Sequence, residues 1–211
     1  QGFDDGHIDV SCLNGFPFAG EVPPIEYGTA PAAKAQRKMP LDEIVKSRLT
    51  NNEMILHGVR PSQWTGDLVS GTEEDSKYGW MAERKPFRPE DIRENNLSRR
   101  LVVREFREHL NQGKGGERSR IVDHLSEGGH NMCTWCTRKC TVDGVDAFRT
   151  LLMWLLALGY SLIMSKRDVE SAYRKVPIAV DHLWLTGVVW CDENELWWSK
   201  HVTMPFGAVA S

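Results

Sequence analysis

The residues with the clearest chemical potential lie in the run YSLIMSKRDVESAYRKVPI, which covers positions 160–178. An apolar segment, residues 160–164, precedes Asp168, and this order predicts a buried strand that delivers a carboxylate to its exposed end. An Asp at a strand end can bind Mg²⁺, which takes oxygen ligands and keeps positions open for phosphates. Tyr173 would place an aromatic face beside whatever the metal holds. An Asp that closes a strand also commonly serves as a turn or cap residue.

Two other segments flank this one in a fixed order. Residues 120–123 (RIVD) precede it, and residues 204–207 (MPFG) follow it. In order and spacing the three segments resemble a retroelement (retrotransposon-type) reverse transcriptase: the Arg segment of the fingers, the palm segment with the first catalytic Asp, and the PFG segment that supports the template and the incoming base. One departure is His124, which stands where the family has Asp, with Asp123 one place early.

The resemblance implies an RNA-directed DNA polymerase that transfers a nucleotide from a dNTP to a primer 3′-OH with two metal ions. Asp168 would be the catalytic ligand that bridges two Mg²⁺ (or Mn²⁺) ions, and the backbone carbonyl of Val169 would touch one of them. The family's second carboxylate pair, an aromatic-x-Asp-Asp turn, does not occur in these 211 residues. With Gln1 first and Ser211 last, we expect a fragment that is inactive alone and binds the metal only with the complete palm.

The resemblance also implies a nucleotide site. Arg120, with Lys114 from the Gly-rich turn that precedes it, would neutralise the triphosphate, since an arginine fork binds phosphate in a bidentate manner. Tyr173 would lie under the deoxyribose and exclude a 2′-OH. Phe206 and Gly207 would line the pocket of the nascent base pair. The partners implied are an RNA or DNA template-primer and dNTPs; no oligomeric state is indicated.

Two alternatives fit parts of the sequence. The first is a catalytically dead or domesticated copy of the polymerase that binds nucleic acid without catalysis. The second is a small metal-binding module, because His130, Cys133, Cys136 and Cys140 have the spacing of zinc or iron–sulfur ligands. Against the second alternative, the segment around Trp135 is strand-like, so Cys133 and Cys136 would point to opposite faces.

Composition sets further limits. The net charge of −3 excludes a polyanion binder by overall composition, whereas residues 84–120 carry 11 Lys and Arg against 6 Asp and Glu. This basic stretch is either a nucleic-acid footprint or a solvated helix face. The longest apolar stretch, residues 151–158, is far shorter than the roughly 20 residues of a membrane span. Five cysteines do not form a secreted disulfide framework. We therefore expect an intracellular protein, in nucleus or cytoplasm, without a membrane segment.

The order of the predicted helices and strands indicates an α+β fold. By the resemblance, this fold is the fingers and a partial palm of a reverse transcriptase, with an antiparallel sheet packed by helices. Residues 1–60 read as an extended or disordered lead-in with a short helix from Pro40, and residues 61–211 as the truncated polymerase domain. Helices are predicted to start at Thr72 and at Pro89, and a strand covers residues 99–106.

Residues 143–159 give the strongest helix signal, and we expect this helix to pack on the sheet and hold the Asp168 strand. Residues 182–202 predict a β-hairpin around a polar loop at 191–194. The tryptophans of this hairpin favour packing over base stacking. Arg174 is interpreted as a solvated neighbour of the site.

Overall fold

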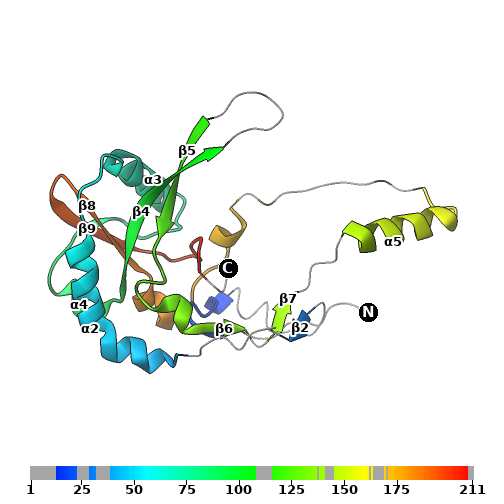
Figure 1. Ribbon diagram of the computed structural model, residues 1–211. Helices are drawn as coiled ribbons and strands as arrows, with labels where there is room; N and C mark the ends of the chain where they lie inside the picture. The colour runs from blue at the N-terminus through cyan, green and yellow to red at the C-terminus, as the bar shows by residue number, and fades with distance from the viewer. Residues whose placement is uncertain are drawn as a thin grey trace.

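The computed structural model describes residues 13–22, 29–31, 39–107, 116–136, 138–140, 145–161, 163, 169 and 171–208. Within these ranges the chain forms an α+β fold with a mixed sheet, as predicted at the level of class (Figure 1). The α-helices are α2 (Leu41–Gly58), α3 (Thr65–Lys77), α4 (Asp91–Glu94) and α5 (Val145–Ala157). The strands are β1 (Gly20–Val22), β2 (Thr29–Pro31), β3 (Lys85–Pro86), β4 (Leu97–Arg107), β5 (Gly116–Asp123), β6 (Thr134–Cys136), β7 (Arg138–Cys140), β8 (Gly187–Asp192) and β9 (Glu195–Lys200). Short 3-10 helices are η1 (His130–Met132), η2 (Ala172–Lys175) and η3 (Val180–Leu185).

The main sheet has the strand order β3-β9-β8-β4-β5. Its pairs are antiparallel except for β4 and β8, which run parallel and place Leu97 beside Gly187. The prediction of an antiparallel sheet is therefore wrong at this pair. The reason is topological: β4 and β8 are joined by a long crossover connection, which parallel strands require and a hairpin does not provide.

Strand β4 changes partners along its length. Its first residues, Leu97–Arg99, pair with β8, whereas Arg100–Arg107 pair with β5. The β4–β5 ribbon consequently extends beyond the rest of the sheet (Figure 1). Strands β4 and β5 form an antiparallel ladder, and residues 108–115 between them lie outside the described residues.

Strand β8 is buried on both faces, which explains its continuous apolar sequence. Val189 packs in a cluster with Ile55 of α2, and Val188 packs in another with Leu68 of α3. Trp190 retains only 2% exposure, so the expected packing role holds for this indole. The two helices thus cover opposite faces of the same strand.

The predicted β8–β9 hairpin is confirmed, and the geometry of its turn explains why it could be predicted from the sequence. Glu193 and Asn194 both have positive φ, 47° and 69°, as a two-residue type I′ turn demands. The register pairs Asp192 with Glu195 on either side of this turn. The first strand starts later than expected, at Gly187, because residues 180–185 form η3 instead.

Part of the predicted lead-in belongs to the core. Phe18 and Ala19 are buried in a cluster with Ile44 and Leu185. Strand β1 pairs with β6, and the backbone of Phe16 exchanges hydrogen bonds with the chain around Ile178. The described segments of residues 1–60 are therefore packed against the remainder of the fold.

One helix end and one helix start differ from the sequence prediction. Helix α2 does follow Pro40 but continues to Gly58, well beyond the short helix expected. Thr72 does not start a helix; it lies inside α3, where its hydroxyl donates to the Leu68 carbonyl. The acidic run after Thr72, a good first-turn signal, instead occupies the last turns, because tertiary contacts of α3 outweigh a preference of that size.

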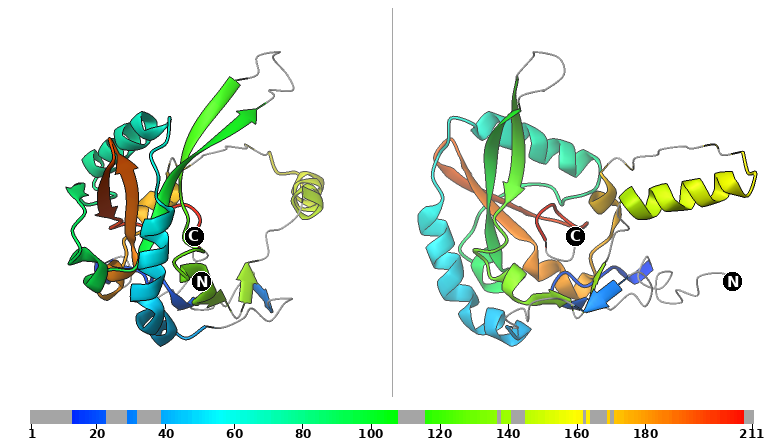
Figure 2. Two further views of the ribbon diagram at one scale, coloured as in Figure 1. Left: turned by 60° about the vertical axis from the view of Figure 1, so that its left-hand side comes forward. Right: turned by 45° about the vertical axis from the view of Figure 1, so that its right-hand side comes forward.

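Helix α5 forms as predicted but does not pack on the sheet. Figure 2 shows it apart from the sheet in both views, and Met153 and Trp154 are 62% and 60% exposed. The buried strand predicted ahead of Asp168 is not observed at the described residues, since Ile163 is 98% exposed. No helix in the described part of the chain is long and apolar enough to cross a membrane.

Gly128 occupies a space that a larger residue cannot share. A Cβ at this position would lie 2.6 Å from the Leu97 carbonyl oxygen and closer still to the His130 ring. We expect Gly128→Ala to lower the free energy of unfolding by about 1–3 kcal/mol, because backbone and buried ring must both move. Urea denaturation followed by tryptophan fluorescence measures the change.

Gly66→Ala is the matched control. Gly66 lies in the first turn of α3 and is exposed, and a methyl group added to its Cα would meet no atom within 4 Å. Alanine there should raise stability by up to about 1 kcal/mol, because glycine loses more backbone entropy in a helix. Equal effects of the two substitutions would contradict the packing of Gly128.

Candidate functional site

Two residues predicted to bind nucleotide line one open pocket, and a third contacts one of them. Arg120 of β5 and Phe206, in the loop after β9, both line a cavity of about 560 Å³, here named the Arg120 pocket. Tyr173 of η2 packs edge-on against Phe206, with ring centroids 5.4 Å apart. Segments that are distant in the sequence therefore meet at this cavity.

Local structure fixes both walls of the Arg120 pocket. On one wall, Arg120 pairs with Val103 across the β4–β5 ladder, and the neighbouring Ser119 hydroxyl donates to Asp67 of α3 at 3.1 Å. On the other wall, Ser171 has a left-handed backbone (φ 52°) that starts the η2 turn. Such a conformation is uncommon for serine, and it places Ser171 in the wall of the pocket at the start of η2.

The PFG loop is anchored behind Phe206. The Met204 amide donates to the Val176 carbonyl at 2.9 Å, and the Met204 side chain is buried. Gly207 has φ 92°, which favours glycine, and its carbonyl accepts a hydrogen bond from Asn131. Phe206 itself stays 53% exposed, so its ring is presented at the surface of the pocket.

A buried charge network lies beneath the pocket. Arg100 of β4 contacts Asp75 of α3 and, at 3.3 Å, Asp123 at the end of β5. Arg174 of η2 contacts the same Asp75 oxygen at 3.3 Å and the His201 ring at 2.9 Å. His201, directly after β9, closes the network with a 2.7 Å contact to Asp123. Five side chains thus tie α3, β4, β5, η2 and the end of β9 together.

The contacts of His201 define its protonation state. Arginine can only donate, so the Arg174 guanidinium requires Nδ1 of His201 to accept. The proton therefore sits on Nε2 and is donated to Asp123. Burial lowers the pKa of His201 against the opposing attraction of Asp123, which agrees with a neutral ring. Burial alone would raise the pKa of Asp123, but Arg100 and then His201 hold it well below its usual range.

Sequence reasoning misses most of this network. The sequence interpretation of Arg174 as a solvated neighbour is wrong, since it is only 8% exposed and has two partners in the network. Arg100 has the pattern of a surface residue in an alternating strand, and its side chain is fully buried. The structure gives Asp123 two partners in this network, Arg100 and His201.

Other predicted residues stay untested by geometry. Asp168 and Lys114 lie outside the described residues. Val169 is described and is 61% exposed. In the part of the chain that the structure describes, no group of three His, Cys, Asp or Glu side chains is placed to hold a metal ion.

The alternative metal module is not favoured by the surroundings of its first ligand. Nδ1 of His130 donates to the Leu125 carbonyl at 2.9 Å, and Nε2 accepts from the Asn96 amide at 2.9 Å. Both ring nitrogens are therefore engaged, and burial lowers the pKa of this histidine. Burial also raises the pKa of the Cys133 thiol to about 11, so it is not a ready thiolate. The side chains of Cys136 and Cys140 lie outside the described residues.

The chain matches no protein-family model and no curated protein. The geometry of the site is therefore the basis for assigning a function.

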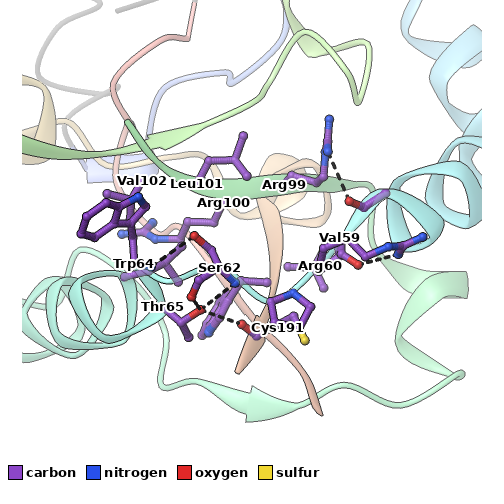
Figure 3. A pocket seen from close by; sticks show the side chains of 15 residues that line it. Val59, Arg60, Ser62, Trp64, Thr65, Arg99, Arg100, Leu101, Val102 and Cys191 are labelled. Carbon is purple, nitrogen blue, oxygen red and sulfur yellow. Dashed lines mark hydrogen bonds between the residues drawn. The ribbon is translucent and has the colours of Figure 1, made fainter. Parts of the chain in front are cut away.

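A second pocket of about 270 Å³ lies where the α2–α3 connection meets β4 and β8 (Figure 3). The connection is held in shape by the Thr65 hydroxyl, which donates to the Ser62 carbonyl at 2.7 Å. Arg99 on its rim is paired with Glu127 at 2.7 Å. Of the described residues predicted to bind nucleotide, Arg120 and Phe206 line the Arg120 pocket, and none lines this second pocket.

Proposed function

We propose that residues 61–211 form the fingers and part of the palm of a retroelement RNA-directed DNA polymerase, with the Arg120 pocket as the nucleotide site. The observation that carries the proposal is the convergence of Arg120, Tyr173 and Phe206. These residues come from three segments that were linked only by resemblance, yet Arg120 and Phe206 line one cavity and Tyr173 contacts the ring of Phe206. A chance similarity would not require this proximity.

Each of the three residues has chemistry suited to a deoxynucleoside triphosphate. Arg120 is exposed on an edge strand, where its fork can bind phosphate oxygens. Tyr173 is 41% exposed and braced by Phe206, so its ring can support a sugar and exclude a 2′-OH. Phe206 offers an aromatic face to a base. Arg120, Tyr173 and Phe206 could thus contact the phosphate, the sugar and the base of the nucleotide, respectively.

The buried network supports the pocket from below and reaches its lining through Asp75 and Arg174. The charge of Asp75 is compensated within the protein by Arg100 and Arg174. Glu74 also lines the pocket, so Arg120 and Arg174 are the side chains there that can attract a triphosphate. The network also holds the η2 turn, and with it Tyr173, against the β4–β5 wall.

The metal chemistry of such a polymerase cannot be completed by the described residues. Asp168 lies outside them, and the described chain lacks a three-carboxylate cluster. When bound, Mg²⁺ or Mn²⁺ would stabilise the attacking and leaving oxygens of the transfer. The residues assigned here bind and orient the nucleotide; catalysis needs Asp168 together with an aromatic-x-Asp-Asp turn, which these 211 residues do not contain.

Substitution of Arg120 tests the proposal on the chain as it stands. We expect the chain to bind a dNTP in the presence of Mg²⁺, and Arg120→Ala to weaken the Kd about tenfold or more, because a hydrogen bond to a charged group is lost. Calorimetric titration with dTTP provides the measurement.

Arg149→Ala is the control, since Arg149 is an exposed arginine of α5 that does not line the pocket. Absence of dNTP binding by the wild-type chain, or an equal loss in both variants, would contradict a nucleotide site at Arg120. Primer extension by a protein that also carries an Asp-Asp turn then separates a polymerase from a remnant that binds without catalysis.

A further inference from the structure

A stacked pair of aromatic rings stands beside the Arg120 pocket. Tyr78 and Trp80 have ring centroids 4.6 Å apart and an interplanar angle of 22°. Both residues line a neighbouring cavity of about 480 Å³, here named the Tyr78 pocket. The two pockets share Glu74, Asp75, Trp80 and Ser171 in their walls, so they are adjacent hollows of one surface.

The pair is held rigidly by its backbone. Tyr78 ends α3, and Gly79 adopts φ 72°, the left-handed conformation that commonly follows a helix end. The Trp80 amide donates to the Asp75 carbonyl at 2.9 Å, and its carbonyl accepts from the Val202 amide at 3.0 Å. Trp80 is thus fixed between α3 and the segment after β9, and it sets the plane on which Tyr78 rests.

Packing alone does not account for Tyr78. Its side chain remains 62% exposed, so it contributes little to the core. Stacking on Trp80 leaves a flat, ordered aromatic surface in solvent. An ordered aromatic face costs little entropy to use in binding, and every nucleobase has a π-face that can stack on it.

The polar residues of the Tyr78 pocket suit a base more than a phosphate cluster. Asp75 is already paired with Arg100 and Arg174. The remaining charged residues of the lining are Glu74 and Lys175, one of each sign. A carboxylate can accept hydrogen bonds from the amino group of a base, and a single lysine can meet one phosphate.

We propose that Tyr78 and Trp80 form a stacking subsite for an unpaired nucleobase of single-stranded RNA or DNA. The ligand class rests on the proposed function, because the adjoining Arg120 pocket would hold the incoming nucleotide. The Tyr78 pocket adjoins the Arg120 pocket, and it binds the strand mainly through stacking, with Lys175 as a single phosphate contact. Its affinity is therefore less sensitive to salt than a phosphate site is.

Fluorescence anisotropy with a labelled oligothymidylate tests the subsite. Tyr78→Leu should weaken binding about tenfold, and Tyr78→Phe, which keeps the ring, should stay within about twofold of wild type. The slope of log K against log salt should be the same for Tyr78→Leu and wild type, whereas Lys175→Gln should reduce it. Tyr160→Leu is the control, because Tyr160 is also 60% exposed but follows α5 and does not line the pocket.

The outcomes separate this inference from the nucleotide site. Wild-type affinity in Tyr78→Leu, an equal loss in Tyr160→Leu, or no binding of the oligonucleotide by the wild-type chain would each overturn the subsite. Oligonucleotide binding that depends on Tyr78, in a chain that binds no dNTP, would support the subsite and reject the proposed polymerase site. Arg120-dependent dNTP binding without a Tyr78 effect would give the reverse result.

Discussion

Arg100→Met should lower the free energy of unfolding by about 3–5 kcal/mol, because it leaves buried carboxylates without their principal cation. The Arg100 side chain is fully buried and bridges Asp75 and Asp123. Methionine keeps a similar apolar stem, so the charge rather than the volume accounts for the loss. Urea denaturation at neutral pH measures it, with the midpoint and slope fitted separately.

The adjacent Arg99 provides a matched control. Its ion pair with Glu127 is partly exposed on both sides, 28% and 27%, and Arg99→Met should cost less than about 1 kcal/mol. Adding Asp123→Asn to Arg100→Met should restore part of the lost stability, since one uncompensated charge is removed. A small effect of Arg100→Met alone would show that water or a rearranged Arg174 replaces the bridge.

Stability should fall steeply as the pH is lowered from about 7 to 5. Burial lowers the pKa of both His201 and His130 in the folded chain, so the unfolded chain binds more protons below the ordinary histidine value of 6.5. Their contribution to stability is present above that value and is lost as the pH falls toward the folded pKa. Each proton taken up on unfolding contributes a slope of about 1.4 kcal/mol per pH unit, so the two together approach about 2.7.

Unfolding curves at several pH values, with single histidine variants, check this expectation. His201→Gln and His130→Gln should each remove about half of the slope between about pH 6.5 and 5, in addition to their own cost in stability. His124→Gln is the control variant, because the His124 side chain is 48% exposed. A flat profile in the wild type, or equal slopes in all three variants, would show that the buried rings are protonated in the folded state.

A second decline is expected in stronger acid. The pKa of Asp123 is held below its ordinary value of 3.8, chiefly by Arg100 once burial is overcome. A depressed carboxylate pKa stabilises the folded chain above the unfolded value, and this contribution is lost as the pH falls through the folded pKa. The buried histidines therefore change the stability of the chain between about pH 7 and 5, whereas Asp123 changes it in stronger acid.

Local signals were sufficient for some elements of this fold. The β8–β9 hairpin was predictable because its turn chemistry lies within four residues, and helix α5 because its apolar period is continuous. The parallel pairing of β4 with β8 was not predictable, since no short-range pattern records which distant strand will be the neighbour. The packing of α5 was predicted wrongly for the same reason. An apolar helical pattern indicates that a helix can be buried, but it does not indicate which surface the helix packs against.

In the candidate site, too, some residues could be predicted from local sequence signals and others could not. Arg120 and Phe206 could be chosen from the sequence because their types and order resemble reverse transcriptase segments, a resemblance that stays a prediction. The charge network could not, because an arginine in an alternating strand has the same sequence pattern whether its guanidinium meets solvent or a buried acid. Only the three-dimensional convergence of Asp75, Arg100 and Asp123 distinguishes the two.

The change of partner along β4 has a consequence for the order of folding. The β4–β5 and β8–β9 ladders join segments close in the sequence, whereas three residue pairs of the β4–β8 ladder join Leu97–Arg99 to Gly187–Val189. Each doubling of a closed loop costs only about 0.6 kcal/mol more entropy, yet that cost precedes the gain from distant contacts. The two hairpins can therefore form early, and their docking along a single short seam becomes the slow step.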